Sequence, residues 1–254
     1  MSVLLDVQHV TMHFGGVQAL TDVSFQVMKG EFLSLIGPNG AGKTTMLRAI
    51  TGVVSPQSAG IHLAGRAIHG LPTHKRAALG LAMTNQIVSP FNTMTLRDNV
   101  ALAVGHKRIA TIVKAVTTMD RRSERKKAGE LLEVVGIGEH ADQEVLGQPL
   151  GLLKRLEVAR ALALEPKLLL LDEPLAGLNH VEAARLADVV AGINREGLTV
   201  VMIEHNLGEV LRISDRLVVL DNGRKIAEGE PEPVMRLPHV RAAYVGKEAE
   251  NAAA

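Results

Sequence analysis

Residues 37–45 have the types and the spacing that hold phosphate groups. Their sequence, Gly37-Pro38-Asn39-Gly40-Ala41-Gly42-Lys43-Thr44-Thr45, fits the pattern G-x-x-x-x-G-K-[ST] without a mismatch. The glycines allow the backbone to turn its N–H groups toward phosphate oxygens, and the N-terminus of a following helix adds positive potential. In such a loop Lys43 reaches the β- and γ-phosphates, and the hydroxyl of Thr44 holds Mg²⁺. The loop therefore predicts binding of a nucleoside triphosphate with magnesium.

The residues on either side of this loop have the patterns of a strand and a helix. The apolar run 32–36 precedes the loop and is typical of a buried strand, whereas residues 46–50 follow it with helical character. A glycine-rich turn that matched by chance would not need these flanks. The strand–loop–helix context therefore favours a phosphate-binding loop.

A second apolar run, 168–171, ends in two carboxylates, Asp172 and Glu173. Parallel sheets place ligands at the carboxyl ends of their strands, which is where these side chains are expected. Asp172 would hold Mg²⁺ through its coordination shell, and Glu173 would orient and activate the attacking water. By itself the pair would fit an acidic turn equally well. The phosphate-binding loop upstream favours triphosphate hydrolysis.

Two further strands end in polar side chains. Residues 199–203 lead into Glu204-His205-Asn206, and residues 81–84 lead into Asn85-Gln86. His205 is placed to hydrogen-bond the γ-phosphate or the water, and Gln86 to contact both the Mg²⁺ and the water. A lone histidine is more often structural. The position of His205 after a buried strand favours a role in the site.

Composition limits the class of protein. The chain has 254 residues, 46% of them apolar and 22% charged, which is ordinary for one large or two small globular domains. Aromatic residues make up 2%, which disfavours nucleic-acid binding by base stacking. The absence of cysteine excludes disulfides, thiol nucleophiles and thiolate metal sites. The N-terminus lacks a signal-peptide pattern, and no apolar run approaches the roughly 18 residues of a spanning helix, so we expect at most docking on a membrane complex.

Strands and helices are expected to alternate along most of the chain. Strand patterns cover residues 3–9, 23–28, 32–36, 60–65, 81–84, 167–171 and 199–203, and a β-hairpin is expected at 216–220 and 224–228. Helical patterns cover residues 46–50, 72–78, 95–102, 130–135, 152–164 and 181–195. This alternation predicts a mostly parallel sheet that is covered on both faces.

The segment 87–146 has a different texture and is expected to be a helical insertion. Within it, residues 106–127 carry eight Lys or Arg and two Asp or Glu. Such a run is typical of a solvated helical face, and binding to a specific partner is the alternative.

The motifs together resemble the nucleotide-binding subunits of ABC transporters. Residues 37–45 match the Walker A loop, and residues 168–173 match the Walker B strand. Phe14 matches the aromatic residue that stacks on adenine, and Gln86 matches the Q-loop. Residues 155–162 match the helix after the signature, and His205 matches the switch histidine. The lead-in to Gln86 is unusual for the family. The resemblance implies an α/β P-loop NTPase (ABC ATPase) fold: a RecA-like, mostly parallel core sheet, N-terminal antiparallel β strands and a helical subdomain. It also implies one ATP-binding domain over 1–254, with its core at 1–86 and 147–229, the helical subdomain at 87–146, and a C-terminal helix and tail at 230–254.

Several segments are similar to the branched-chain amino-acid (LivG-type) branch of that family. Gly177, Leu178 and Asn179 form the D-loop, and Asn179 stands where most ABC ATPases have aspartate. Residues 203–206, the basic insertion and the tail 243–246 also look like that branch. The resemblance implies an ATPase on the cytoplasmic face of the inner membrane, with two permease subunits, a second ATPase, indirectly a periplasmic or extracellular solute-binding protein, and no nucleic acid. Importers of urea, short amides and aromatic acids share these features, so the solute stays open.

The signature segment departs from the family pattern L-S-G-G-Q. The matching residues are Gln148, Pro149, Leu150, Gly151 and Leu152, of which only Gly151 keeps the family residue. Pro149 has neither the hydroxyl nor the N–H of the usual serine. A hydrogen bond to a charged group contributes about 1.5–3 kcal/mol, which is roughly one to two orders of magnitude in affinity or rate.

In this family the signature acts on the ATP of the opposite subunit. Two copies of this chain would therefore make two weakened sites, whereas a second ATPase with an intact signature would complete one good site. The resemblance thus implies a heterodimer. The alternative is that proline and leucine are tolerated here.

Other functions fit the sequence less well. Non-transport ABC ATPases usually carry long coiled coils or two fused cassettes, which this chain lacks. Export or lipid-extraction ATPases are often homodimers, which the poor signature disfavours. A P-loop kinase or GTPase would leave the helix near residue 151 unexplained, and no guanine-reading N-K-x-D occurs.

Overall fold

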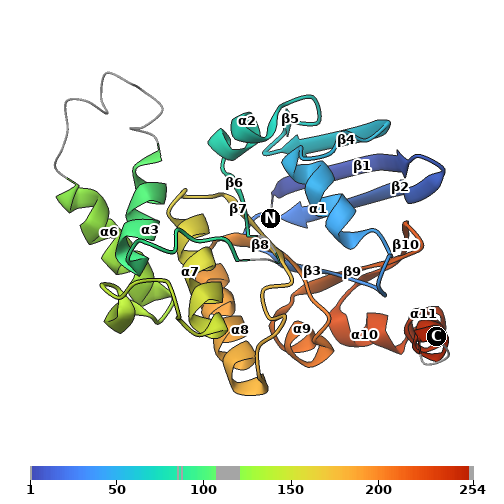
Figure 1. Ribbon diagram of the computed structural model, residues 1–254. Helices are drawn as coiled ribbons and strands as arrows, with labels where there is room; N and C mark the ends of the chain where they lie inside the picture. Colours follow the sequence, from blue (N-terminus) through green and yellow to red (C-terminus); the bar gives the residue numbers. More distant parts are fainter. Residues whose placement is uncertain (1, 85, 87, 107–120, 252–254) are drawn as a thin grey trace.

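The computed structural model describes residues 2–84, 86, 88–106 and 121–251 (Figure 1). The strands are β1 (Val3–Phe14), β2 (Val17–Met28), β3 (Phe32–Ile36), β4 (Ser58–Leu63), β5 (Arg66–Ala67), β6 (Leu81–Thr84), β7 (Leu168–Asp172), β8 (Thr199–Ile203), β9 (Arg216–Asp221) and β10 (Arg224–Gly229). The helices are α1 (Lys43–Thr51), α2 (Thr73–Ala78), α3 (Leu96–Val104), α6 (Arg122–Val134), α7 (Leu150–Leu162), α8 (His180–Arg195), α9 (Leu207–Ile213), α10 (Pro231–Arg236) and α11 (Pro238–Asn251), with a short 3₁₀ helix η1 (Gly138–His140).

The larger sheet has six strands in the order β10-β9-β3-β8-β7-β6. Neighbours from β9 to β6 pair in parallel, and β10 pairs antiparallel with β9, as the expected hairpin requires. The mostly parallel sheet is thus confirmed. Because parallel strands end at the same edge, the residues that follow β3, β6, β7 and β8 gather there.

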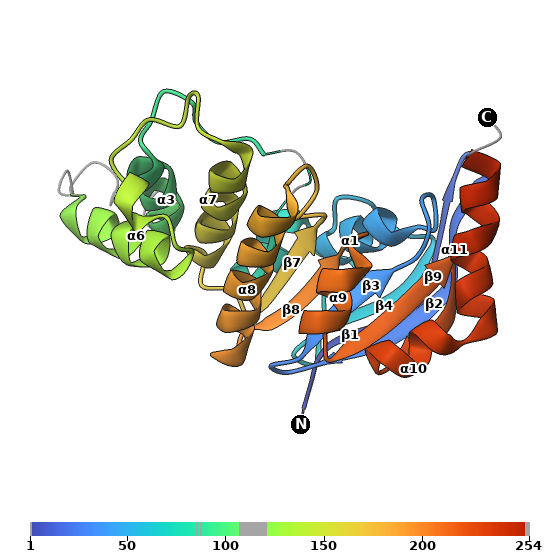
Figure 2. The same ribbon diagram turned by 90° about the horizontal axis from the view of Figure 1, so that it is seen from below.

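Both faces of this sheet are buried, and alternate residues of one strand serve the two faces. Leu169 and Leu171 of β7 join a core cluster with α7, α8 and α9, whereas Leu168 and Leu170 join a second cluster with α1, β1 and β2. Figure 1 shows α8 and α9 below this sheet and the strands β1, β2 and β4 above it, and in the view from below in Figure 2 the two helices lie in front. Burial on both sides explains the continuous apolar runs of the central strands.

The smaller sheet is antiparallel, in the order β2-β1-β4-β5. Its strands β1 and β2 each have 12 residues and are longer than the sequence pattern suggested. The pattern underestimated their length because their pairing is irregular: His9 (φ 49°) and Asp22 (φ 52°) have left-handed backbones, and the register shifts there. Such a bulge breaks the period-two alternation while the strand continues. Phe14 and Val17 then close the hairpin around a two-residue turn.

The segment after β6 contributes helices that pack beside α7. Helix α3 lies against α6, and both contact α7. Residues 122–127 of the basic run form the first turns of α6, where Arg122, Lys126 and Lys127 are exposed; residues 107–120 of that run lie outside the described residues. Within the described part of the chain, no helix is long and apolar enough to cross a membrane.

Candidate functional site

The phosphate-binding loop connects β3 to α1, and its shape depends on two glycines. Gly37 (φ 146°) and Gly42 (φ 99°) have backbones in the region that favours glycine. A Cβ on Gly37 would lie 2.0 Å from the carbonyl oxygen of Leu220, and one on Gly42 would lie 2.6 Å from that of Ala19. Neither position accepts a side chain. Helix α1 begins directly after Gly42, so its first N–H groups face the loop.

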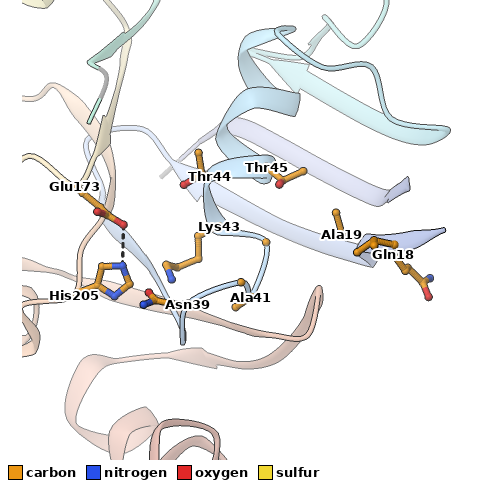
Figure 3. Close-up of a pocket in the computed structure, with 12 residues that line it drawn as sticks. Gln18, Ala19, Asn39, Ala41, Lys43, Thr44, Thr45, Glu173 and His205 are labelled. Carbon is orange, nitrogen blue, oxygen red and sulfur yellow. Dashed lines mark hydrogen bonds and ion pairs between the residues drawn. The ribbon is translucent and has the colours of Figure 1, made fainter. Parts of the chain in front are cut away.

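Lys43 is the first residue of α1, and its side chain lies inside the loop. Its ammonium donates to the carbonyl oxygens of Gly37 at 2.7 Å and Pro38 at 3.0 Å, and the residue is buried. In Figure 3 the ammonium points toward the side of the cavity where Glu173 and His205 lie. The loop therefore holds one positive charge at the centre of the site.

Thr44 and Asp172 come together from α1 and the end of β7. The threonine hydroxyl lies 3.3 Å from Oδ1 of Asp172. Burial raises the pKa of the Asp172 carboxyl above its ordinary value, and the neighbouring Glu173 carboxylate raises it further. The raised pKa means that nearby positive charges do not fully compensate the Asp172 carboxylate. This carboxylate and the Thr44 hydroxyl are oxygen ligands of the kind that a hard divalent cation prefers.

Glu173 is held on both carboxylate oxygens. Its Oε1 lies 2.8 Å from Nε2 of His205, and its Oε2 accepts a hydrogen bond from Nε2 of Gln86 at 2.6 Å. The three residues follow β7, β8 and β6, which pair side by side. Glu173 also has a left-handed backbone (φ 50°), which is uncommon for a residue with a side chain. Its N–H donates to the carbonyl of Ile203 at 3.0 Å.

A cavity joins these groups to the antiparallel sheet (Figure 3). The loop lines it from Asn39 to Thr45, Glu173 and His205 line one end, and Val17, Gln18 and Ala19 of β2 line the other. Phe14 does not line this cavity; it lies half-exposed at the turn of the β1–β2 hairpin. Sequence reasoning missed the contribution of residues 17–19, which follow the turn of the β1–β2 hairpin.

The signature segment forms the start of α7, away from the cavity. Pro149 is the N-cap, without a side-chain cap hydrogen bond, and Leu150 is exposed. Leu152 is only 8% exposed and belongs to the core cluster of α7 and α8. Its apolar type therefore matches a buried position. Helix α7 begins two residues earlier than the expected 152, because proline is well suited to the entry of a helix.

The D-loop packs against this helix start and caps α8. A Cβ on Gly177 would come 2.9 Å from Cδ2 of Leu150. Leu178 is partly buried against the core cluster. Asn179 and Glu182 form a reciprocal capping box: the Asn179 side chain accepts from the Glu182 N–H at 3.0 Å, and the Glu182 carboxylate accepts from the Asn179 N–H at 3.3 Å.

Two buried charged residues near Glu173 were not identified from the sequence as site residues. The Glu204 carboxylate accepts hydrogen bonds from the N–H groups of Leu175 at 2.5 Å and His205 at 3.0 Å. Burial raises the pKa of Glu204, and these backbone bonds oppose that shift. The Lys154 ammonium donates to the carbonyl oxygens of Gln86 at 2.9 Å and Glu173 at 3.2 Å. The only sequence signal for the role of Lys154 is its position one turn after the start of α7.

The C-terminal helix also reaches the phosphate-binding loop. Burial raises the pKa of Tyr244 in α11 to about 12, and a hydrogen bond with the backbone of Gly37 acts in the opposite direction. The tail residue that resembles the LivG-type branch is thus in contact with the first residue of the loop.

The chain is similar to known proteins over nearly its whole length. The profile of the family described as "ABC transporter" matches residues 20–176. The high-affinity branched-chain amino acid transport ATP-binding protein LivG of Salmonella typhimurium is 38% identical over 96% of this chain and 98% of its own. The corresponding BraF of Pseudomonas aeruginosa is 39% identical, with the same coverage. The crystal structure of the ADP conformation of MJ1267, an ATP-binding cassette of an ABC transporter, superposes with a TM-score of 0.85 and 29% identity, covering 97% of this chain and 100% of that one. With its phosphate-binding loop and strand-end carboxylates on this fold, the chain belongs to the ABC transporter family as an ATP-binding domain.

Proposed function

We propose that this chain binds ATP with Mg²⁺ and hydrolyses it to drive an importer of branched-chain amino acids or of a related small amide or aromatic-acid solute. The observation that carries the proposal is the Glu173 carboxylate, held by His205 and Gln86 at the end of the cavity that contains Lys43. The names of the LivG and BraF relatives support transport of branched-chain amino acids.

Each residue then has a defined role in hydrolysis. The loop N–H groups and Lys43 bind the β- and γ-phosphates. Water attacks the γ-phosphorus, the bond to the β–γ bridging oxygen breaks, and Glu173 takes the proton of the water, giving ADP and phosphate. His205 and Gln86 hold the carboxylate in the direction of that water. The preformed contacts at 2.8 and 2.6 Å support this orientation.

Thr44 and Asp172 are the residues that would hold Mg²⁺, with Gln86 nearby. The raised pKa of Asp172 supports a cation partner, because a divalent ion would relieve its repulsion from Glu173. At sites of this kind Mg²⁺ takes its other ligands from phosphates and water. When bound, Mg²⁺ neutralises charge on the β- and γ-phosphates.

We propose that adenine stacks on Phe14, beside the cavity residues 17–19 of the same hairpin. The half-exposed side chain of Phe14, which pairs with Val17 of the cavity lining, supports this placement. Base–aromatic stacking contributes about 1–3 kcal/mol, so Phe14→Ala should weaken ATP binding roughly 5- to 150-fold. Fluorescence titration with a labelled ATP analogue measures the change, and an unaltered Kd would reject Phe14 as the adenine contact.

We propose that the functional unit is a heterodimer with a second ABC ATPase subunit, docked on two permease subunits at the cytoplasmic face of the membrane. A solute-binding protein delivers the solute. The proline at position 149, which lacks the hydroxyl of the usual serine, supports the need for a partner with an intact signature. We assign the whole chain to one ATP-binding domain, in which 1–86 and 147–229 form the core, 87–146 a helical subdomain that passes motion to the permeases, and 230–254 the C-terminal region.

The experiment compares phosphate release by the purified chain alone and after co-purification with a second ATPase subunit. We expect slow turnover alone and a marked increase in the pair, and Lys43→Ala in this chain should abolish ATP binding. Full turnover by the chain alone would reject the heterodimer. Normal ATP binding by a folded Lys43→Ala protein would reject the assignment of the phosphate site.

A further inference from the structure

Lys154 is a buried cation on the inner side of α7, four residues after the helix begins at Leu150. The residue is 4% exposed. An unpaired ammonium at such depth would be costly, so its contacts must compensate for the lost hydration. These contacts are the carbonyl oxygens of Gln86 at 2.9 Å and Glu173 at 3.2 Å.

The charges around Lys154 explain why a cation is tolerated there. Burial lowers the pKa of the ammonium, and the carboxylates of Glu204, Glu173, Asp172 and Glu157 oppose that shift, in this order. Lys154 therefore balances negative charge at the strand ends. Its direct hydrogen bonds, however, go to backbone oxygens, which the ammonium fixes in position.

The contact with Glu173 bears on the least ordinary backbone in the site. The left-handed φ of 50° at Glu173 costs conformational energy and needs support from its surroundings. On the amide side, its N–H donates to Ile203 at 3.0 Å. On the carbonyl side, the oxygen accepts from Lys154. Hydrogen bonds therefore hold both peptide groups of Glu173, and the backbone that sets the direction of its side chain is fixed.

The contact with Gln86 supports the same carboxylate from the other side. Lys154 holds the backbone oxygen of Gln86, and the side-chain Nε2 of Gln86 donates to Oε2 of Glu173 at 2.6 Å. One ammonium therefore anchors both backbone segments whose side chains meet. Lys154 of α7 thus connects the segment after β6, at Gln86, with the segment after β7, at Glu173.

We propose that Lys154 is a positioning residue for ATP hydrolysis, which sets the direction of the Glu173 carboxylate by holding the carbonyl groups of Glu173 and Gln86. The inference rests on the proposed role of Glu173 as the base. It also gives α7 two functions, because in the proposed heterodimer its first residues would act on the partner's nucleotide, while its next turn holds the backbone of Glu173 in its own chain.

The test measures kcat, KM, the Kd for a fluorescent ATP analogue and Tm for Lys154→Met and Lys154→Gln, in the complex with the second ATPase. We expect kcat to fall about 10- to 100-fold, because one charge-assisted hydrogen bond to each carbonyl is lost, while the Kd for the ATP analogue changes less than about threefold. Lys154→Arg, which keeps a buried cation with several donors, should restore most of kcat. Arg155→Gln is the matched control, because Arg155 donates from the same helix to the carbonyl of Gly136 at 3.2 Å, away from Glu173; its kcat should stay near wild type.

A second measurement separates positioning from a general packing defect. In the Gln86→Ala background, Lys154→Met should lower kcat by a smaller factor than in the wild type, because the Gln86 side chain, through which the carbonyl held by Lys154 acts on Glu173, has been removed. Fully multiplicative losses would overturn the inference, as would wild-type kcat in a folded Lys154→Met or Lys154→Gln protein. If Lys154→Met does not fold, the comparison of Lys154→Gln with Lys154→Arg decides. Absence of hydrolysis by the wild-type complex would instead reject the proposed function.

Discussion

Nε2 of His205 lies 2.8 Å from Oε1 of Glu173, and this contact joins the ends of β8 and β7. The two strands pair in parallel, with Asp172 opposite Ile203, so the residues that follow them must emerge side by side. Since Gln86 donates to the second oxygen, each of the two carboxylate oxygens has one side-chain partner. A prepositioned carboxylate of this kind is suited to orient water with little reorganisation.

Glu173→Gln should separate ATP binding from hydrolysis. The amide keeps the shape of the side chain but cannot accept a proton, so we expect phosphate release to fall about 10²- to 10⁴-fold while ATP stays bound. Nucleotide retained after gel filtration and phosphate release in the heterodimer measure the two effects. Glu139→Gln changes an exposed carboxylate of η1 and should behave as wild type. Normal turnover by Glu173→Gln beside an intact partner would show that another group is the base.

Asp172→Asn should make the nucleotide-free protein more stable at neutral pH. The pKa of Asp172 is raised in the folded chain by burial and by Glu173, so the folded state binds this proton more tightly than the unfolded state. The ionised carboxylate therefore destabilises the fold, and the penalty grows as pH rises from the ordinary value of 3.8 through the raised one. We expect a higher Tm for the variant at pH 7 and a difference that narrows as pH falls toward about 4.

Asp142→Asn is a control of opposite sign for that experiment. The Arg97 guanidinium, through a hydrogen bond, lowers the pKa of the exposed Asp142 carboxyl. Its ionised form therefore supports the fold above the ordinary pKa, and this support disappears as pH falls through the lowered pKa. Thermal melts should show a small loss for Asp142→Asn at neutral pH. A lower Tm for Asp172→Asn at pH 7 would contradict the unfavourable environment of Asp172.

Asn179→Ala should lower the free energy of unfolding, because it removes one half of the capping box of α8. Loss of an N-cap side chain costs about 0.5–2 kcal/mol. Urea denaturation measures the change, and Asn179→Asp should stay close to wild type because its carboxylate accepts the same N–H of Glu182. An unchanged midpoint for Asn179→Ala would mean that water replaces the cap without loss.

Pro149→Ser should raise the ATPase activity of the chain in the absence of a second subunit. A serine hydroxyl restores a donor toward a γ-phosphate across the dimer, and one hydrogen bond to a charged group corresponds to roughly a 10- to 100-fold change. Phosphate release by the chain alone measures it. Leu152→Gln should instead destabilise the protein, since that side chain is buried in the core. An unaltered rate for a folded Pro149→Ser protein would favour tolerance of proline in the signature segment.

Local patterns made much of the site predictable. The strands β3, β7 and β8 are short apolar runs in the sequence, because a strand buried on both faces is continuously apolar. These runs make the positions of the phosphate-binding loop and of the polar residues that follow the strands predictable. The lengths of β1 and β2 were less predictable, since the bulge near His9 and Asp22 interrupts the alternation that identifies a strand.

The sequence by itself determined the phosphate-binding loop and the two carboxylates at the end of β7, since each depends on residues adjacent in the chain. It also determined the ABC transporter family, since the family's motifs follow one another in order along the chain. Only the tertiary structure decided that Leu152 is a core residue, that residues 17–19 line the cavity, and that Lys154 contacts Glu173 and Gln86. The physical reason is distance along the chain. Lys154 lies 68 residues from Gln86, and packing between helix and sheet, not local propensity, brings the two together.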